Sequence, residues 1–380
     1  MDIIVKYIDE LLEKSTPEAP MWNIEKIRQG LKSNWNYIDG VMIKAVLQMY
    51  DVTKDEKYLK FADNFIDYRV HEDGTIDGYN IGEKNIDNVN AGKTLFELYD
   101  LTGKEKYKKA VDLVYSQIEI MPRCQNEARS FWHKDIYPNQ VWLDGLYMGL
   151  PFYLEYETRY NDRKNYSDIF GQFKFVIENM RNPINGLYFH AMDTSREAFW
   201  CDKVTGLSQH SWLRAIGWYT MALIDTLDQV DNKDHKYDAE CKMLEDAFKD
   251  LVDSMLKYQD ESGMWYQVVN YGGMEKNYLE TSGSSIMAYA ILKGVRLGYL
   301  PENYREYAEK AINGICDKYL NIKDGEMSLG GICLVAGLGG KGNRPGTYDY
   351  YMSEPIVEDD AKGVGPFLLA YTEMLAYKNR

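Results

Sequence analysis

The chain has 380 residues, of which 45% are hydrophobic and 27% charged, a composition that supports a large core and excludes a disordered chain. Its formal net charge of −15 argues against nucleic acid and anionic membrane surfaces as partners. The five cysteines contain no Cys-x-x-Cys pair, which argues against a disulfide framework and a thiolate zinc site.

The first residues form an acidic, amphipathic segment. Residues 2–14 have neither the basic start nor the small-residue cleavage site of a secretion signal. No apolar run in the sequence approaches the length needed to span a membrane. We therefore expect a cytoplasmic protein with no membrane partner, and we predict a single domain over residues 1–380.

A turn between helices recurs along the chain. Residues 50–58 and 99–107 share the pattern Tyr-Asp-x-Thr-x-x-Glu-Lys-Tyr, and related Lys-Tyr or Asn-Tyr pairs return at 165–166, 236–237 and 303–304. Self-similarity of this kind is typical of repeated supersecondary units. The pattern predicts a series of helical hairpins.

Two kinds of helix alternate in these hairpins. Strongly apolar helices, which are buried on all sides, are expected to open near residues 39, 87, 144, 211, 281 and 362. Amphipathic helices are expected at residues 2–14, 56–70, 104–120, 164–180, 237–258 and 303–319. The sequence thus predicts an all-α fold, an (α/α)6 six-hairpin barrel whose inner helices point the same way. Short loop strands are expected over its mouth, at residues 187–190 and 265–269.

Asp39, Asp87 and Asp144 lie at the starts of consecutive inner helices, so we expect them to meet at the mouth with His133 and Arg214. Helix N-termini carry partial positive charge, which favours an anionic ligand. That field would also keep a carboxylate ionised. A cluster of this composition predicts a binding or catalytic site.

Asp144 has apolar and aromatic neighbours in Trp142, Leu143 and Leu146. Desolvation would raise its pKa and suit it to proton transfer, whereas the helix N-terminus opposes that rise. The residue is also placed to be an ordinary N-cap. The sequence alone leaves these alternatives open.

Other signals point away from cofactors. Residues 337–342 match Gly-x-Gly-x-x-Gly, but Pro345 breaks the chain and no βαβ unit surrounds them, so we interpret them as a flexible loop. The five histidines include no His-x-x-x-His pair. We expect no metal and no cofactor. Pro151 falls inside the third inner helix and is expected to kink it.

The loop at residues 131–135 reads Phe-Trp-His-Lys-Asp, and the helix start at 142–149 reads Trp-Leu-Asp-Gly-Leu-Tyr-Met-Gly. Further stretches of this kind are residues 35–37, 86–87, 186–191, 212–219, 263–267, 280–284 and 348–351. In this order, over nearly the whole chain, they resemble the unsaturated rhamnogalacturonyl hydrolases of glycoside hydrolase family 105.

The resemblance implies removal of a 4,5-unsaturated galacturonyl residue from the non-reducing end of lyase-generated rhamnogalacturonan disaccharides, by Asp-catalysed hydration of the C4=C5 bond. It assigns the acid/base role to Asp144 and supporting catalytic roles to Asp87 and His133. The substrate-binding residues it implies are Tyr37, Lys134, Tyr137, His190, Arg214 and Trp218. We add Trp142 and Trp212 as rings able to stack on sugar faces.

Several alternatives remain at this point. Arg214 could pair with the uronate carboxylate or with a mouth aspartate, and Trp142 and Trp218 could simply pack in the core. Asp87 could raise the pKa of Asp144 by repulsion or hold a sugar hydroxyl. The rival functions are an unsaturated glucuronyl hydrolase, a conventional inverting glycosidase, a sugar 2-epimerase and a non-catalytic oligosaccharide-binding protein.

Overall fold

A computed structural model describes residues 3–378 of the chain. The inner helical segments are α3 (Tyr37–Thr53), η2 with α5 (Ile86–Gly92 and Lys93–Thr102), α7 (Leu143–Tyr160), α9 (Leu213–Gln229), α11 (Thr281–Arg296) and α14 (Ala361–Lys378). The outer helices are α1 (Ile3–Glu13), α4 (Glu56–Asp67), α6 (Glu105–Ile120), α8 (Tyr166–Asn179), α10 (Asp238–Leu256) and α12 (Arg305–Tyr319). The predicted all-α six-hairpin barrel is confirmed.

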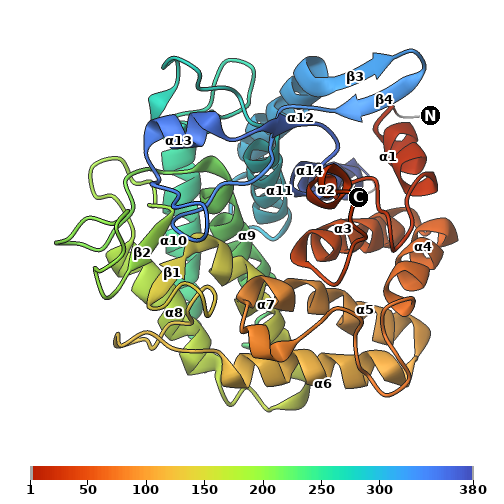
Figure 1. The fold of residues 1–380 in the computed structure, drawn as a ribbon, viewed down its shortest axis with the longest axis horizontal. Coiled ribbons are helices and arrows are strands. Elements are labelled where there is room, and N and C mark those ends of the chain that lie inside the picture. Colours follow the sequence, from red (N-terminus) through yellow and green to blue (C-terminus); the bar gives the residue numbers. More distant parts are fainter. Residues whose placement is uncertain (1–2, 379–380) are drawn as a thin grey trace.

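The inner ring closes on itself. Each inner helix contacts the next one along the chain, and α14 contacts α3, so the last hairpin packs against the first. Figure 1 shows the ring end-on, with the outer helices around it. Within residues 3–378, no helix is long and apolar enough to cross a membrane.

Local signals start and stop these helices. The Asn36 side chain accepts a hydrogen bond from a first-turn amide of α3, and Asp55 does the same for α4. Gly103 ends α5 in the left-handed conformation, with φ of 68°. At these three helix ends, the residue beside the boundary supplies the signal that starts or stops the helix.

Small residues let the inner helices approach closely. A Cβ atom added at Gly40 would lie 2.5 Å from the Cα of Ala91, and one at Gly283 would lie 2.3 Å from the Cγ of Leu213. Neither position has room for a side chain. The backbones of neighbouring inner helices are thus in direct contact, as expected from their small residues.

The strands differ from the prediction. Residues 187–190 contribute only a single bridge at Tyr188, and the strand β2 (Ala191–Asp193) follows them, paired antiparallel with β1 (Gln140–Trp142). Residues 265–269 make only isolated bridges. The second inner segment also begins as a 3-10 helix, η2, rather than as an α-helix.

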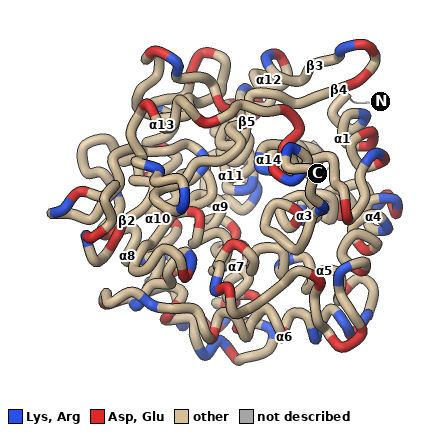
Figure 2. Tube along the Cα trace, viewed as in Figure 1, with Lys and Arg blue, Asp and Glu red and all other residues tan. Residues whose placement is uncertain are grey.

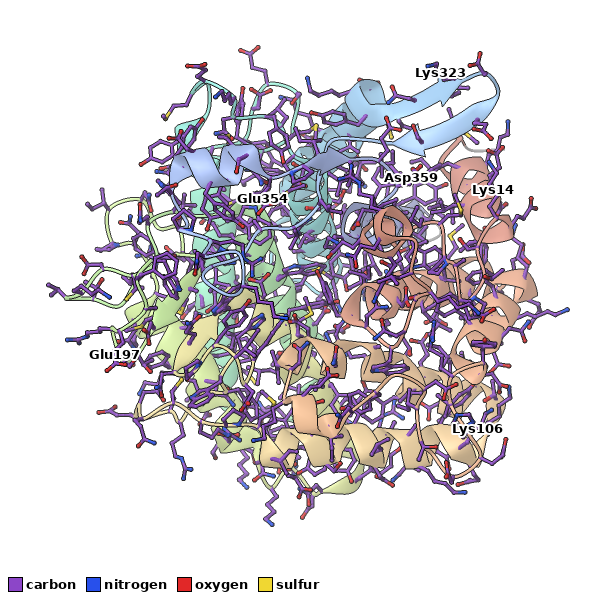
Figure 3. The ribbon with its side chains drawn as sticks, viewed as in Figure 1. Lys14, Lys106, Glu197, Lys323, Glu354 and Asp359 are labelled. Atoms are coloured by element: carbon purple, nitrogen blue, oxygen red, sulfur yellow. The ribbon has the colours of Figure 1, made fainter. Side chains whose placement is uncertain are left out.

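Elements that the sequence did not predict lie between the last two hairpins and elsewhere around the mouth. They are α2 (Ile24–Gln29), α13 (Tyr348–Ser353), the hairpin β3 (Leu320–Lys323) and β4 (Glu326–Leu329), and the pair β5 (Ile332–Cys333) and β6 (Ile356–Val357). Tyr7 of α1 donates to Asp359 Oδ1 at 2.6 Å and so ties the first helix to the segment before α14. Figure 3 labels Lys14, Lys323 and Asp359 on the groove that separates α1 from the hairpin.

Asp39 does not lie at the mouth, so this part of the prediction was wrong. Its side chain is 4% exposed and accepts hydrogen bonds from Trp22 Nε1 at 2.8 Å, Ser33 Oγ at 3.0 Å and Asn36 Nδ2 at 2.9 Å. Burial raises its pKa, and these donors oppose that rise. Asp39 ties the segment before α3 to the helix.

We expect Asp39→Ala to lower the free energy of unfolding by about 3 kcal/mol, because buried donors such as Trp22 Nε1 lose their acceptor. Urea denaturation of the purified protein measures the change. The control is Asp51→Ala, an exposed position at the other end of α3. Equal stabilities for the two variants would contradict this role of Asp39.

Candidate active site

One cavity of about 150 Å³ lies at the N-terminal ends of the inner helices. Its lining residues are Glu25, Tyr37, Asp87, His133, Lys134, Tyr137, Trp142, Asp144, Met148, Trp212, Arg214, Trp218, Val335, Ala336 and Arg344. The residues predicted for the site line it, except for Asp39 and for His190, which contacts Asp144. The structure therefore gathers residues that are spread over much of the chain.

The cavity is built from the first turns of the inner helices. Tyr37 is the first residue of α3, and Asp87, Asp144 and Arg214 are the second residues of η2, α7 and α9. The predicted shared mouth is confirmed for these four segments. Figure 2 shows charged residues around the outer helices and further ones near the centre of the ring.

Asp87 has two partners in the loop before β1. Its Oδ2 forms an ion pair with Lys134 Nζ at 2.7 Å, and its Oδ1 lies 3.5 Å from His133 Nε2. Burial lowers the pKa of Lys134, but the contact with Asp87 outweighs it and raises that pKa overall. The negative charge of Asp87 is therefore largely compensated by a neighbouring cation.

His133 presents a neutral ring to the cavity. Burial lowers its pKa to about 4, although Asp87 opposes this effect. The ring stacks on Trp142 with centroids 4.5 Å apart and planes 6° apart. The backbone of His133 fixes the loop, since its N–H donates to Gln140 and its carbonyl accepts from Ile86. The ring is thus left to contact a ligand.

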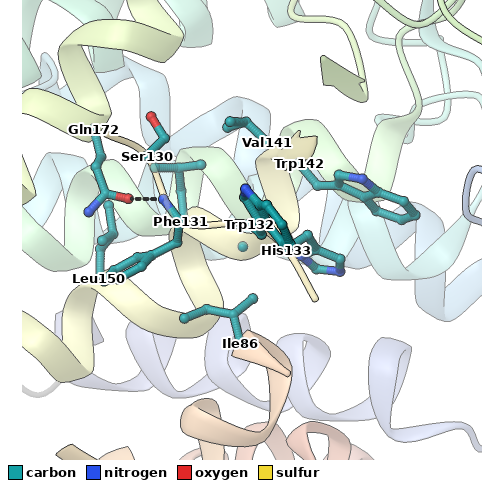
Figure 4. A pocket seen from close by; sticks show the side chains of 11 residues that line it. Ile86, Ser130, Phe131, Trp132, His133, Val141, Trp142, Leu150 and Gln172 are labelled. Carbon is teal, nitrogen blue, oxygen red and sulfur yellow. Dashed lines mark hydrogen bonds between the residues drawn. The ribbon is translucent and has the colours of Figure 1, made fainter. Parts of the chain in front are cut away.

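The loop that carries His133 is held by a hydrogen bond to the outer helix α8. The amide of Phe131 donates to Gln172 Oε1 of α8 at 3.0 Å, the bond drawn in Figure 4. A void of about 10 Å³ lies between the loop at residues 130–133 and the side chains of Leu150 and Ile86. It is no larger than the roughly 10–15 Å³ that one water needs. The ligand cavity is therefore the one on the other side of His133.

Asp144 contacts His190 at the edge of the cavity. Its Oδ2 lies 3.4 Å from His190 Nε2, and both atoms are buried without a hydrogen-bond partner in the described part of the chain. His190 Nδ1 lies 2.8 Å from the hydroxyl of Tyr351 in α13, which orients the ring. Two polar atoms thus remain available to a ligand or a water.

The pKa of Asp144 reflects opposing influences. Burial raises it, but the His190 imidazole and, to a smaller extent, His133 lower it, and the net effect is a pKa below the ordinary value. Of the influences that the sequence left open, those that lower the pKa of Asp144 outweigh burial in the free protein. Asp87 is not among the groups that act most on Asp144.

Arg214 supplies a positive charge with no carboxylate partner. Its guanidinium donates to Ser282 Oγ at 3.1 Å and to the carbonyls of Cys333 at 2.6 Å and Leu334 at 3.5 Å. Among the described residues, no carboxylate lies within ion-pair distance of it. It lies over the Trp212 ring, 4.8 Å from the centroid. The predicted alternative of a salt bridge to a mouth aspartate is therefore excluded within residues 3–378.

The three tryptophans predicted for the site both line the cavity and pack against the core. Trp142, Trp212 and Trp218 each line the cavity and are at most 5% exposed. Trp218 also stacks on Tyr147 of α7, with centroids 4.9 Å apart and planes 12° apart. Packing and ligand contact are thus compatible for these rings.

Glu25 and Arg344 line the cavity and were missed by sequence reasoning. Glu25 pairs with Lys362 at 2.8 Å. Arg344 Nη2 donates to the Tyr137 hydroxyl at 2.9 Å and has no acidic partner within ion-pair distance in the described chain. It follows the glycine-rich stretch interpreted as a flexible loop, and no local signal marks it. Only the path of that loop over Tyr137 brings Arg344 to the site.

Metal ligation has no geometric support in the described residues, where no group of three or more His, Cys, Asp or Glu could hold an ion. The mouth contains His133 and His190, but each contacts a different aspartate. The expectation that the protein needs no metal or cofactor stays a prediction.

Comparison with known proteins bears on this geometry. The model for Glycosyl Hydrolase Family 88 matches residues 8–378. A solved glycoside hydrolase of family 105 from C. acetobutylicum ATCC 824 is 43% identical, covers 98% of this chain and 100% of its own, and superposes with a TM-score of 0.87. This chain belongs to the glycoside hydrolases of families 88 and 105. It is therefore a glycosidase.

Two further relatives of this glycosidase are less similar or shorter. The unsaturated rhamnogalacturonyl hydrolase YesR of Bacillus subtilis is 25% identical over 353 residues, which cover 91% of each chain. Protein Atu3128 of Agrobacterium fabrum is 39% identical over 235 residues, covering 60% of this chain and 98% of its own. The family resemblance read from the motifs is confirmed.

Replacing His190 by Asn in this glycosidase is expected to raise the pKa of Asp144, because burial remains while the imidazole that stabilises the carboxylate is lost. Infrared titration of the carboxyl band, with Asp144→Asn to assign it, measures the shift. His235→Asn, at an exposed histidine, is the matched control. An unchanged pKa in His190→Asn would mean that another group stabilises the Asp144 carboxylate.

Proposed function

We propose that this glycosidase removes a 4,5-unsaturated galacturonyl residue from the non-reducing end of lyase-generated rhamnogalacturonan disaccharides. Asp144 hydrates the C4=C5 double bond as acid and base. The name of the Bacillus subtilis relative supports the substrate. The observation that carries the proposal is the Asp144 carboxylate, whose Oδ2 contacts His190 but has no hydrogen-bond partner among residues 3–378, at a cavity that also contains a guanidinium with no carboxylate within ion-pair distance.

The positive charge of the Arg214 guanidinium favours a uronate as the ligand. Three of the five N–H donors of Arg214 are occupied by protein oxygens, and no carboxylate among residues 3–378 lies within ion-pair distance of it, the nearby Glu280 being bridged through Ser282. Arg344 adds a second such cation at the same cavity. An anionic sugar therefore enters a favourable local field in a protein whose net charge of −15 would otherwise repel it.

The proposed reaction begins at carbon. In the unsaturated uronate, C5 carries both the ring oxygen and the carboxylate. Protonation of C4 by Asp144 leaves positive charge on C5, which the ring oxygen shares, and water then adds at C5 while the Asp144 carboxylate takes its proton. The hemiketal opens to a ketone, and the former glycosidic carbon, now a hemiacetal, expels the aglycone.

Binding of the substrate raises the pKa of Asp144 and so favours its protonated form. The pKa of Asp144 is below its ordinary value in the free protein, so a proton must be taken up for catalysis. A uronate carboxylate bound nearby raises the pKa of an adjacent carboxyl group by repulsion and by excluding water. Asp87, compensated by Lys134, is better suited to hold a sugar hydroxyl together with His133.

Asp144→Asn is expected to lower kcat by about 1,000-fold or more, because an amide cannot donate the proton. The measurement is the loss of the enoate ultraviolet absorbance of an unsaturated disaccharide, with circular dichroism to check the fold. Asp135→Asn, at an exposed residue near the same site, is expected to stay within about twofold of wild type. If Asp144→Asn kept a tenth of the activity, a different residue would be the acid.

Turnover in heavy water is expected to place deuterium on C4 of the released uronate. In labelled water the new oxygen should enter at C5, and an unsaturated thioglycoside should also be cleaved, because hydration does not require protonation of the glycosidic atom. Mass spectrometry of early product measures both labels before ketone exchange.

A conventional inverting glycosidase gives the opposite result, with no deuterium on C4 and the oxygen label on the anomeric carbon. An oligosaccharide-binding protein gives no product. The 4,5-unsaturated residues derived from glucuronate and galacturonate have the same ring, because C4 is no longer a stereocentre, so preference for a disaccharide with another aglycone or linkage would retain the chemistry and change the substrate. An unlabelled C4 would refute hydration even if the right disaccharide were cleaved.

A further inference from the structure

The helix that carries Asp144 contains a break in its hydrogen-bond ladder. Pro151 lies inside α7, which nevertheless continues from Leu143 to Tyr160. Proline has no backbone N–H, so the carbonyl four residues earlier loses its helical donor. That carbonyl belongs to Tyr147, within the first two turns of α7. A buried carbonyl without a donor destabilises a helix.

A side chain from another inner helix takes the place of the missing amide. Lys93, the first residue of α5, places Nζ 2.6 Å from the carbonyl oxygen of Tyr147. The same Nζ lies 3.5 Å from the centroid of the Tyr147 ring. Lys93 is 8% exposed. One ammonium or amine group thus contacts both the backbone and the ring of Tyr147.

The contact is not an ion pair. Within residues 3–378, no carboxylate lies within 4 Å of Lys93 Nζ, although Lys44 and Lys293, in the same barrel, both have carboxylate partners. Burial lowers the pKa of Lys93 to about 7, with Asp225 opposing and Lys44 adding to the effect. A lysine keeps N–H donors in either protonation state. The hydrogen bond to Tyr147 therefore does not depend on the charge.

Tyr147 connects this contact to the cavity. It follows Asp144 by three residues on α7, so its carbonyl and the Asp144 side chain belong to the same short stretch of helix. Its ring stacks on Trp218, which lines the cavity. A shift of Tyr147 would move both the carboxylate and one wall of the site. Displacements on the order of 1 Å are enough to slow catalysis roughly 100-fold.

We propose that Lys93 is a positioning residue that replaces the amide missing at Pro151 and so holds the start of α7, with Asp144 and Trp218, in the geometry needed for catalysis. The inference deepens the proposed function, since it takes Asp144 as the acid. It explains why a lysine without a carboxylate partner is buried beneath the site.

The test uses the fact that the missing donor can be restored. Pro151→Ala returns an amide to the Tyr147 carbonyl, so it should make Lys93 dispensable. Lys93→Met removes the donor and keeps an unbranched apolar side chain. The variants are Lys93→Met, Pro151→Ala and the combination of the two. The matched control is Lys44→Met, which removes a barrel lysine paired with Glu97 rather than with α7, alone and with Pro151→Ala.

We expect Lys93→Met to lower kcat roughly tenfold or more with KM changed less than about threefold, and to speed hydrogen exchange of amides at residues 143–152. The combination with Pro151→Ala should restore both to within about threefold of the Pro151→Ala protein. Pro151→Ala should give no such recovery in the Lys44→Met background. A purely structural role would lower stability while leaving kcat of the folded protein unchanged.

Two results would overturn the proposal: wild-type kcat in folded Lys93→Met, or a double variant no better than Lys93→Met. If Lys93→Met fails to fold, the double variant must fold and turn over, and its failure would equally count against the proposal. The exchange measurement needs no substrate. It therefore tests the capping of Tyr147 even if Asp144→Asn were to show that the proposed function is wrong.

Discussion

Several helix starts can share one small cavity only because the backbones of the inner helices touch. At Gly40 and Gly283 a single Cβ atom would collide with the neighbouring inner segment. This closeness brings the first turns of α3, η2, α7 and α9 around a space of about 150 Å³. A wider ring would leave Asp87, Asp144 and Arg214 too far apart to contact one sugar.

Bringing these charges together in a buried place requires that most of them be compensated. Asp87 is compensated by Lys134, and Glu25 by Lys362. Arg214 instead donates to the carbonyl oxygens of Cys333 and Leu334, which occupy two of its N–H groups and carry no net charge. Buried charges without a partner are costly. Their persistence at the mouth is consistent with a site whose remaining partner is an anionic ligand.

The side chains at the mouth are held by groups that are distant in the sequence. His190 is oriented by Tyr351, 161 residues away, and His190 in turn lowers the pKa of Asp144. The Tyr147 carbonyl is met by Lys93 from a different inner helix. The position and the protonation state of Asp144 thus depend on the loops and neighbouring helices as much as on α7 itself.

The fold was accessible from sequence because its signals are local. Apolar and amphipathic helices alternate with regular spacing, and helix starts such as that at Asn36 are marked by capping side chains. The starts also located Asp87, Asp144 and Arg214, because residues in the first turns of parallel inner helices must lie at one end of the barrel. The family motifs around 131–149 added the candidate chemistry.

The tertiary structure decided which of these residues face the cavity. Asp39 lies in the first turn of its helix, as the site residues do, yet its carboxylate accepts hydrogen bonds from Trp22 and Ser33. Arg344 comes from a loop with no local signal and reaches the cavity through Tyr137. The direction of the Asp144 pKa shift follows from His190. Helix formation depends on neighbours within a turn or two, whereas solvation, charge and access depend on chain segments brought together only by folding.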